Sequence, residues 1–181
     1  MTRDENITTP HGELDIRQAR PADTDALTVI YDDAVEWQKA RGMPPGLPPM
    51  PMREIVARRI SRGVIYLASL DGAPAGTITL EADDREVWPE AATDDALYVH
   101  GLAVARSFAG KEIGLAMLAW AERVAASEGK TYVRLDCMAD NPALRAYYVR
   151  AGFVDSGERA LPRRIAARYE KRVGEGGRPW S

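Results

Sequence analysis

The sequence predicts a mixed α/β domain, in which one sheet of about seven strands carries about four helices on its faces. Segments with helical periodicity alternate along the chain with short apolar or alternating segments, and Gly or Pro stands between most of them. The 181 residues suit one hydrophobic core, and 45% hydrophobic with 28% charged residues is typical of a globular protein. We therefore expect residues 13–173 to form a single domain.

Strands are expected where apolar runs are short or alternate with polar residues. The turn Asp71–Gly72, between two such runs, predicts a hairpin. The predicted strands are residues 14–19, 64–70, 75–81, 96–104, 131–137, 153–156 and 166–173. The polar leader 1–12 and the Gly-rich tail 174–181 are expected to be flexible.

The clearest predicted helix covers residues 111–127, where large apolar side chains recur at spacings of four, three and four. Another helix opens at Pro21 and carries an apolar stripe as far as Trp37. The Pro- and Met-rich segment 43–52 ends it, because proline cannot continue a helix. The other two predicted helices are residues 53–62 and 141–151.

Composition excludes several classes of function. A net charge of −3 argues against general nucleic-acid binding. Apolar runs are too short to span a membrane, no secretory signal is visible, and the single cysteine fits a reducing compartment, so the cytoplasm is the expected location. Two histidines and one cysteine, distant in sequence, make a metal site unexpected. The chain is expected to be a monomer or a homodimer.

The most informative segment is a strand, a glycine-containing loop and a strong helix, YVHGLAVARSFAGKEIGLAMLAWAE (98–122). The first four N–H groups of a helix have no partners within it, and the helix dipole adds partial positive charge there. Gly110 and Gly114 bring this backbone close to a bound group, so the loop is suited to phosphate. The alternative is that both glycines only permit a tight turn.

Together with TYVRLDC and NPALRAYYVRAGF (141–153), this segment resembles the GNAT superfamily of acetyltransferases, and IRQARPADTDAL resembles the usual opening of that domain. The resemblance implies a twisted mixed sheet, splayed between its fourth and fifth strands, with acetyl-CoA as the co-substrate in the gap. It implies backbone contacts to the pantetheine arm from Leu102, Ala103 and Val104. The backbone groups implied for the pyrophosphate belong to Ala109, Gly110, Lys111, Glu112, Ile113, Gly114 and Leu115.

The loop departs from the family pattern, which is Arg or Gln, two residues, Gly, one residue, then Gly or Ala. Ala109, Glu112 and Gly114 stand at the patterned positions. A non-glycine residue at position 112 is tolerable if its φ is negative. A carboxylate beside a pyrophosphate is repulsive unless it points away, so the departure bears on the affinity for coenzyme A.

The resemblance implies that Tyr148, five residues before Phe153, gives a proton to the departing thiolate. The chemistry agrees, because a phenol with a pKa of about 10 stays protonated at neutral pH and can assist a thiol leaving group. The alternative is a core tyrosine. The resemblance also implies that Asn141 hydrogen-bonds the pantetheine, although helix capping before Pro142 suits the sequence equally well.

An amine acceptor is mostly an ammonium ion at neutral pH and must lose a proton before it attacks a thioester. His100 lies on the strand expected to line the gap, and an imidazole can take that proton directly or through water. His-Gly-Leu-Ala-Val resembles the arylalkylamine branch of the family, which favours His100 as the base. Glu81 and water are the competing bases.

The sequence leaves two classes of acceptor, a small-molecule amine and the amine of a peptide end. Residues 81–95 contain seven acids and one base, which either attract a cationic amine or form a solvated loop. Trp37, Trp88 and segment 43–52 are candidate walls of an acceptor pocket, and Trp37 also fits a core position. The sequence thus predicts direct transfer of acetyl from acetyl-CoA to an amine. The alternative is a non-catalytic acyl-CoA-binding module, which Glu112 favours.

Overall fold

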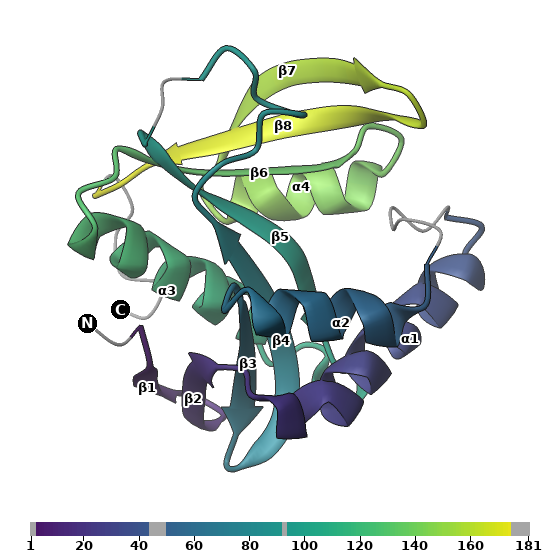
Figure 1. The fold of residues 1–181 in the computed structure, drawn as a ribbon, viewed down its shortest axis with the longest axis vertical. Coiled ribbons are helices and arrows are strands. Elements are labelled where there is room, and N and C mark those ends of the chain that lie inside the picture. Colours follow the sequence, from purple (N-terminus) through teal and green to yellow (C-terminus); the bar gives the residue numbers. More distant parts are fainter. Residues whose placement is uncertain (1–2, 44–49, 92–93, 175–181) are drawn as a thin grey trace. The chain divides into compact units, whose positions relative to one another are not determined.

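The computed structural model describes residues 3–43, 50–91 and 94–174. Its strands are β1 (Glu5–Thr9), β2 (Gly12–Gln18), β3 (Ile65–Leu70), β4 (Ala73–Glu81), β5 (Ala96–Val104), β6 (Tyr132–Met138), β7 (Val154–Leu161) and β8 (Arg164–Arg172). Its α-helices are α1 (Thr24–Lys39), α2 (Met52–Ser61), α3 (Ile113–Ser127) and α4 (Pro142–Arg150), and two 3-10 turns lie at Pro21–Asp23 and Arg106–Phe108. The predicted mixed α/β class is confirmed (Figure 1).

The strands form one sheet in the order β1-β2-β3-β4-β5-β6-β8-β7. Antiparallel pairing joins β1 to β2, β2 to β3 and β3 to β4, and it also joins β6 to β8 and β8 to β7. The β5–β6 pair is parallel. Hairpins therefore build both outer parts of the sheet, and α3 connects the parallel pair, as a parallel connection requires.

The structure contains eight strands, one more than predicted, because β1 lies within the expected flexible leader 1–12. Ile7 is the only large apolar residue of β1, so its pattern in the sequence is weak. The strand is held by pairing with β2 across a tight turn, in which the Thr9 hydroxyl donates to the Gly12 carbonyl at 2.8 Å. The tail beyond Gly174 and most of segment 43–52 lie outside the described residues.

The described residues fall into two compact units, and the first comprises residues 3–79 and 101–117 with the gap noted above. Here α1 packs against α2, and α2 against β3. One core cluster of this unit consists of Ala19, Leu27, Ile30, Tyr31, Val56, Ile65, Leu67 and Ala105. The stripe predicted on α1 is buried at its beginning but only half-buried at Trp37.

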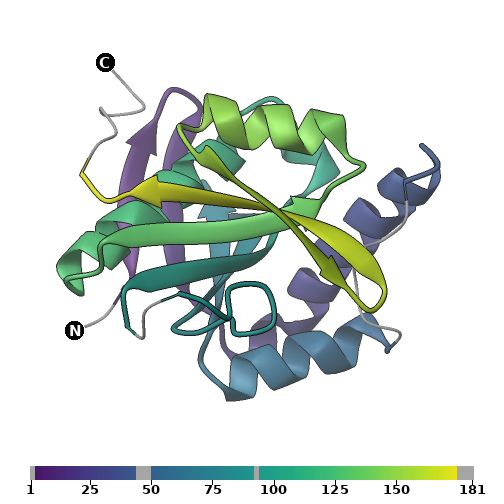
Figure 2. The same cartoon turned by 90° about the horizontal axis from the view of Figure 1, so that it is seen from above.

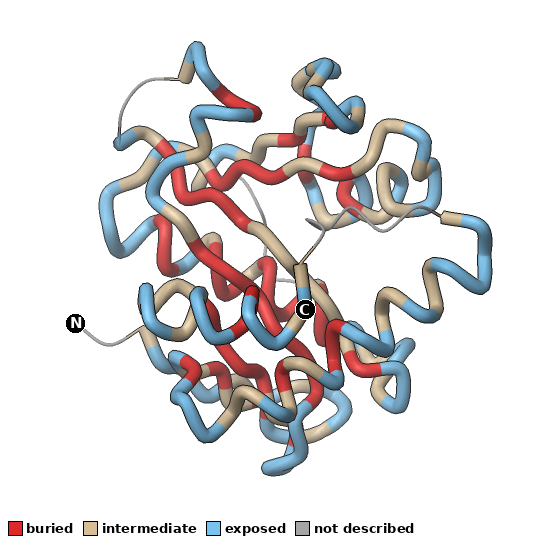
Figure 3. The backbone as a smooth tube through the Cα atoms, turned by 45° about the vertical axis from the view of Figure 1, so that its right-hand side comes forward, coloured by how far each residue is buried: buried red, intermediate tan, exposed pale blue. Residues whose placement is uncertain are grey.

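The second unit comprises residues 80–100 and 118–174 with its own gap. Strands β6, β8 and β7 lie side by side in it, and α4 contacts β7 (Figure 2). A core cluster of this unit consists of Val87, Trp88, Ala96, Tyr98 and Ala166. Figure 3 shows how buried stretches alternate with exposed turns along the chain. In the described ranges, every helix is too short or too polar to cross a bilayer.

Candidate active site

The parallel pairing of β5 with β6 ends within the strands. Partners run from Ala96 opposite Tyr132 to Val99 opposite Leu135, and β5 continues for five residues beyond the last pair. These two strands are the fourth and fifth of the predicted set. Gly101 lies two residues after the last paired residue, Val99, and its φ of 53° bends β5 between His100 and Leu102. Residues 102–104 are the ones expected to hold the pantetheine arm, and each is half-buried.

The loop from β5 to α3 contains two residues in a left-handed backbone conformation. The Ala105 N–H donates to the Ala75 carbonyl at 2.8 Å, which fixes the start of the loop beside β4. Gly110 has a φ of 81° and Glu112 a φ of 56°. Alternation of left-handed with other conformations turns successive N–H groups toward one side, and such concave arrangements bind anions. The loop therefore has the backbone form of an anion site.

Several N–H groups of this loop have no hydrogen-bond acceptor among the described residues. They belong to Gly110, Glu112, Ile113, Gly114 and Leu115. The N–H groups of Ala109 and Lys111 do have partners, the carbonyls of Arg106 and Phe108. Unpaired donors at the positive end of a 15-residue helix are suited to a phosphate group. Within residues 109–115, the N–H groups of Ala109 and Lys111 are thus engaged inside the loop, and the other five have no acceptor in the described part of the chain.

Glu112 does not meet the condition stated for a non-glycine residue, because its φ is positive. Its carbonyl accepts the Ala116 N–H at 3.0 Å, so this residue starts the hydrogen-bonding pattern of α3. Its side chain is exposed. A left-handed conformation costs a side-chain-bearing residue roughly 1–2 kcal/mol. The backbone at position 112 thus has a conformation that favours glycine, although the residue there is glutamate.

Tyr148 lies on α4 and is 6% exposed. Its ring packs edge-on against Tyr147 and Phe153 and tilted against Tyr169, with centroid distances of 5.6, 6.1 and 5.9 Å. Burial raises the pKa of the Tyr148 hydroxyl, and the neighbouring Cys137 thiol contributes in the same direction. Burial likewise raises the pKa of Cys137, to about 11. The phenol is therefore held in its protonated form, as a proton donor must be.

Asn141 caps α4. Its side-chain oxygen accepts the Leu144 N–H at 3.0 Å, and Pro142 occupies the first helical position. The capping interpretation is thus confirmed. A cap uses only the amide oxygen, so the side-chain NH₂ group keeps its two donors for a ligand.

His100 lies beside two carboxylates that the sequence analysis did not single out. Its Nε2 is 3.7 Å from Oδ2 of Asp84, and one ligand atom each of Asp84, His100 and Asp136 all lie within 4.8 Å of one another. Asp136 also forms an ion pair with Arg164. Burial raises the pKa of Asp84, whereas the His100 imidazole and the Val87 N–H lower it. Asp84 is thus the carboxylate that the structure pairs with His100, and Glu81 stays a competing candidate for the base.

This trio is not a preformed metal site. Arg164 already occupies Asp136, so a metal ion would have to displace a guanidinium group. The expectation of no metal stays an expectation. Asp84 was indistinguishable in sequence from its acidic neighbours, and Asp136 lay inside a strand, so neither residue carried a signal that pattern analysis could use.

Most acids of residues 81–95 are engaged by bases. The ion pairs are Asp83 with Arg85, Asp84 with His100, Glu90 with Arg168, Asp94 with Lys130 and Asp95 with Arg134. These ion pairs connect the segment to β5, β6, β8 and the residues before β6, although Asp83, Glu90 and Asp94 keep exposed side chains. Asp84 differs from the other paired acids because its side chain is only 10% exposed and its partner is a histidine rather than an arginine or a lysine.

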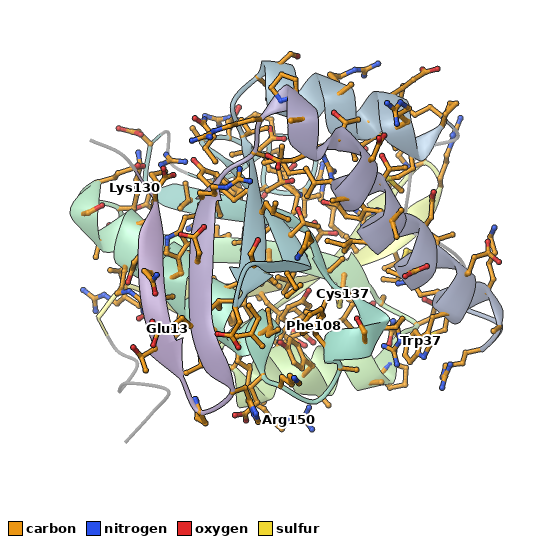
Figure 4. The ribbon with its side chains drawn as sticks, turned by 90° about the horizontal axis from the view of Figure 1, so that it is seen from below. Glu13, Trp37, Phe108, Lys130, Cys137 and Arg150 are labelled. Atoms are coloured by element: carbon orange, nitrogen blue, oxygen red, sulfur yellow. The ribbon has the colours of Figure 1, made fainter. Side chains whose placement is uncertain are left out.

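Trp88 lies in a core cluster of the second unit and is 4% exposed. The sequence suggested it as a wall of an acceptor pocket, but in the structure its ring is buried among core residues. Guanidinium groups of Arg134 and Arg168 lie 5.0 and 5.1 Å from its ring, which pins the loop that carries Asp84. Trp37 is half-buried at the C-terminal end of α1 (Figure 4). Arg41 and Arg106 place guanidinium groups 4.0 and 4.6 Å from its ring, so its surroundings are positively charged.

The sheet is mixed, its parallel β5–β6 pairing ends within the strands, and the loop after β5 leads into α3 with several N–H groups that have no acceptor among the described residues. The family model described as "Acetyltransferase (GNAT) family" matches residues 29–153. This chain belongs to the GNAT family of acetyltransferases.

Individual relatives agree with this assignment. The chain is 31% identical over 137 residues to the uncharacterized N-acetyltransferase YesJ of Bacillus subtilis, covering 72% of this chain and 76% of that protein. A GNAT-family acetyltransferase from Listeria monocytogenes has a TM-score of 0.78 and 29% identity, covering 93% of this chain and all of that one. RimL, a ribosomal L7/L12 α-N-protein acetyltransferase solved with coenzyme A, has a TM-score of 0.66 and 20% identity, covering 93% and 98%.

Proposed function

We propose that this protein is an N-acetyltransferase that transfers the acetyl group of acetyl-CoA to a primary amine by direct attack. The observation that carries the proposal is the set of unpaired N–H groups in residues 110–115, with left-handed backbone at Gly110 and Glu112. A pyrophosphate is the anion that such a loop would bind in a family whose members include a coenzyme A complex.

Chain groups supply the other contacts. Backbone groups of Leu102, Ala103 and Val104 would bind the pantetheine arm, because they belong to the part of β5 that lacks β6 partners. The side-chain NH₂ group of Asn141 would donate to the same arm while its oxygen caps α4. These are main-chain and amide contacts, which hold an uncharged polar arm without titrating.

Proton transfers would be shared by two side chains. His100 takes a proton from the acceptor ammonium, which leaves a neutral amine to attack the thioester carbon. The C–N bond forms, the C–S bond breaks, and Tyr148 gives its hydroxyl proton to the departing thiolate. The attacking nitrogen then loses its second proton, which restores the Tyr148 hydroxyl and leaves a neutral amide. The raised pKa of Tyr148 keeps that proton in place until the thiolate forms. The acceptor is a small-molecule amine or a peptide amine, and the surroundings of Trp37 disfavour that ring as a seat for its cation.

The alternative function is a non-catalytic acyl-CoA-binding module. One observation favours it: Glu112 places a carboxylate on the residue that starts α3, next to the proposed pyrophosphate seat. Binding with no transfer to any amine would support this alternative.

Calorimetric titration with acetyl-CoA, coenzyme A and a longer acyl-CoA tests the co-substrate, and thiol release with a panel of amines tests the transfer. Gly110→Ala and Gly72→Ala form a matched pair, since both glycines have a φ near 80° and open space where a Cβ atom would stand. Both substitutions strain a turn equally, but only Gly110→Ala should weaken binding of acetyl-CoA, by about tenfold or more. No binding of any of the three ligands by the wild type would contradict the proposal.

A further inference from the structure

Asp84 is fixed by its own turn. Its side-chain Oδ1 accepts the Val87 N–H at 3.2 Å, and its carbonyl accepts the Trp88 N–H at 2.8 Å. Trp88 is anchored in the core between two guanidinium groups. The carboxylate therefore has one oxygen engaged by the turn, and the other oxygen, Oδ2, faces Nε2 of His100 at 3.7 Å.

The charged groups around His100 come from three elements. The loop after β4 contributes Asp84, with Glu86 acting electrostatically on it. Strand β6 contributes Asp136, and β8 contributes Arg164, which pairs with Asp136. Because Arg164 balances Asp136, Asp84 is the carboxylate in this group without a permanent positive partner. Its interaction with His100 is reciprocal, so the carboxylate favours the imidazolium form as the imidazolium favours the carboxylate.

We infer that Asp84 is a positioning residue for His100, which holds the imidazole with Nε2–H toward its carboxylate and balances the charge that the ring gains. The inference rests on the proposed function, in which His100 is the base. In the step concerned, an N–H bond of the acceptor ammonium breaks and an N–H bond forms at Nδ1 of His100. The positive charge moves from the acceptor to the ring, and the Asp84 carboxylate stabilises it there.

This arrangement specifies the acceptor class further. A base that is stabilised in its protonated form helps most when the acceptor binds as an ammonium ion and must lose a proton. Aliphatic primary amines are ammonium ions at neutral pH and therefore belong to this class. Aromatic amines, which arrive neutral, gain little from it. Asp84 should therefore matter more for transfer to alkylamines than for transfer to arylamines.

Nuclear magnetic resonance of the imidazoles tests the pair without any activity. The sequence has only two histidines, and His11 lies in an exposed turn, so it serves as an internal reference. In wild-type protein, ¹⁵N shifts should show the neutral His100 ring with its proton on Nε2. In Asp84→Asn, which keeps an oxygen for the Val87 N–H, the titration midpoint of His100 should fall below that of the wild type. His11 should not move.

Asp83→Asn is the matched control, because it removes the adjacent carboxylate, which pairs with Arg85. It should leave the His100 midpoint unchanged. A proton on Nδ1 in the wild type, or an unchanged His100 midpoint in Asp84→Asn, would overturn the inference. The tautomer measurement needs no variant, so the inference stays falsifiable if Asp84→Asn does not fold.

Kinetics supply the second arm. In Asp84→Asn, the acidic limb of the kcat/KM profile for an alkylamine should move to lower pH, and the plateau should fall by roughly tenfold. Affinity for acetyl-CoA should not change. In a His100→Ala background, Asp84→Asn should cause no further loss of kcat/KM. An equal loss in that background would overturn the inference. If the wild type transfers acetyl to no amine, the proposed function fails, whereas the resonance measurements still decide whether Asp84 positions His100.

Discussion

The hydroxyl of Tyr31 donates a hydrogen bond to the carbonyl of Gly101 at 2.7 Å, and the Arg59 guanidinium donates to the Tyr31 oxygen at 3.0 Å. This chain of bonds runs from α2 through α1 to the bend of β5. A Cβ atom at position 101 would lie 2.5 Å from the Tyr31 hydroxyl and 2.6 Å from Arg59 Nη1. The bend next to His100 is therefore in contact with side chains of both helices, and any larger residue at position 101 would be strained and would displace the Tyr31 hydroxyl or the Arg59 guanidinium.

Tyr31→Phe should reduce the free energy of unfolding by about 1–2 kcal/mol, because the Gly101 carbonyl loses its side-chain donor in a largely buried place. Gly101→Ala should cost more, since it adds left-handed strain to the clash with Tyr31. Urea denaturation followed by circular dichroism measures both. If Gly101→Ala proves less destabilising than Tyr31→Phe, the bend does not depend on glycine.

Glu112→Gly should strengthen binding of acetyl-CoA about tenfold without loss of stability. The substitution relieves left-handed strain of roughly 1–2 kcal/mol, which offsets the roughly 0.5–1 kcal/mol that glycine costs in chain entropy. It also removes a negative charge near the pyrophosphate seat. Glu112→Gln separates the two effects, because it removes the charge and keeps the strain. Calorimetry and thermal denaturation of both variants measure them, and unchanged affinity in both would exclude Glu112 as an obstacle to binding.

Tyr148→Phe should lower kcat by roughly 10²–10⁴-fold, the usual scale for acid–base catalysis, with little change in the affinity for acetyl-CoA. Tyr147→Phe is the matched control, since that ring packs edge-on against Tyr148 and loses the same atom. It should retain wild-type turnover. Steady-state thiol release measures both variants, and full activity in Tyr148→Phe would remove this hydroxyl from the mechanism.

Acid should weaken the fold partly through Asp23. The Arg17 guanidinium donates to both carboxylate oxygens at 2.8 Å, and this bond lowers the pKa of Asp23. A carboxyl group with a lowered folded pKa stabilises the protein above its unfolded pKa of about 3.9, and that stability is lost as pH falls through the folded value.

Asp23→Asn should therefore cost about 1–2 kcal/mol at neutral pH, and the difference from the wild type should shrink below about pH 4. Urea denaturation at pH 7, 5 and 3 measures it. Asp33→Asn, on the exposed face of α1, is the control and should leave stability close to that of the wild type at each pH. A difference for Asp23→Asn that stays constant down to pH 3 would contradict the assignment.

The sequence was sufficient for the elements with strong periodicity. Helix α3 was predicted within two residues, because its large apolar side chains recur on one face. Strand β1 was missed because its pairing with β2, rather than its own apolar content, holds it in place. Strand β7 extends well beyond the predicted residues 153–156, since pairing with β8 continues through a stretch that is mostly exposed.

For the candidate site, resemblance selected residues that pattern alone left ambiguous, such as Tyr148. It could not select Asp84 from seven acids in one segment, because only the folded turn orients one of them toward His100. It also could not give the sign of φ at Glu112, since the neighbouring loop and helix impose that conformation on the residue.

Cys137 is the single cysteine, and burial raises the pKa of its thiol to about 11. At neutral pH the thiol therefore keeps its proton, and the reactive thiolate is scarce. Thiol-specific reagents should pass over this residue in the folded protein, so a colorimetric reagent would report released coenzyme A with almost no background. A cysteine introduced on the surface would likewise accept a fluorophore or spin label at one defined position, with Cys137 left in place.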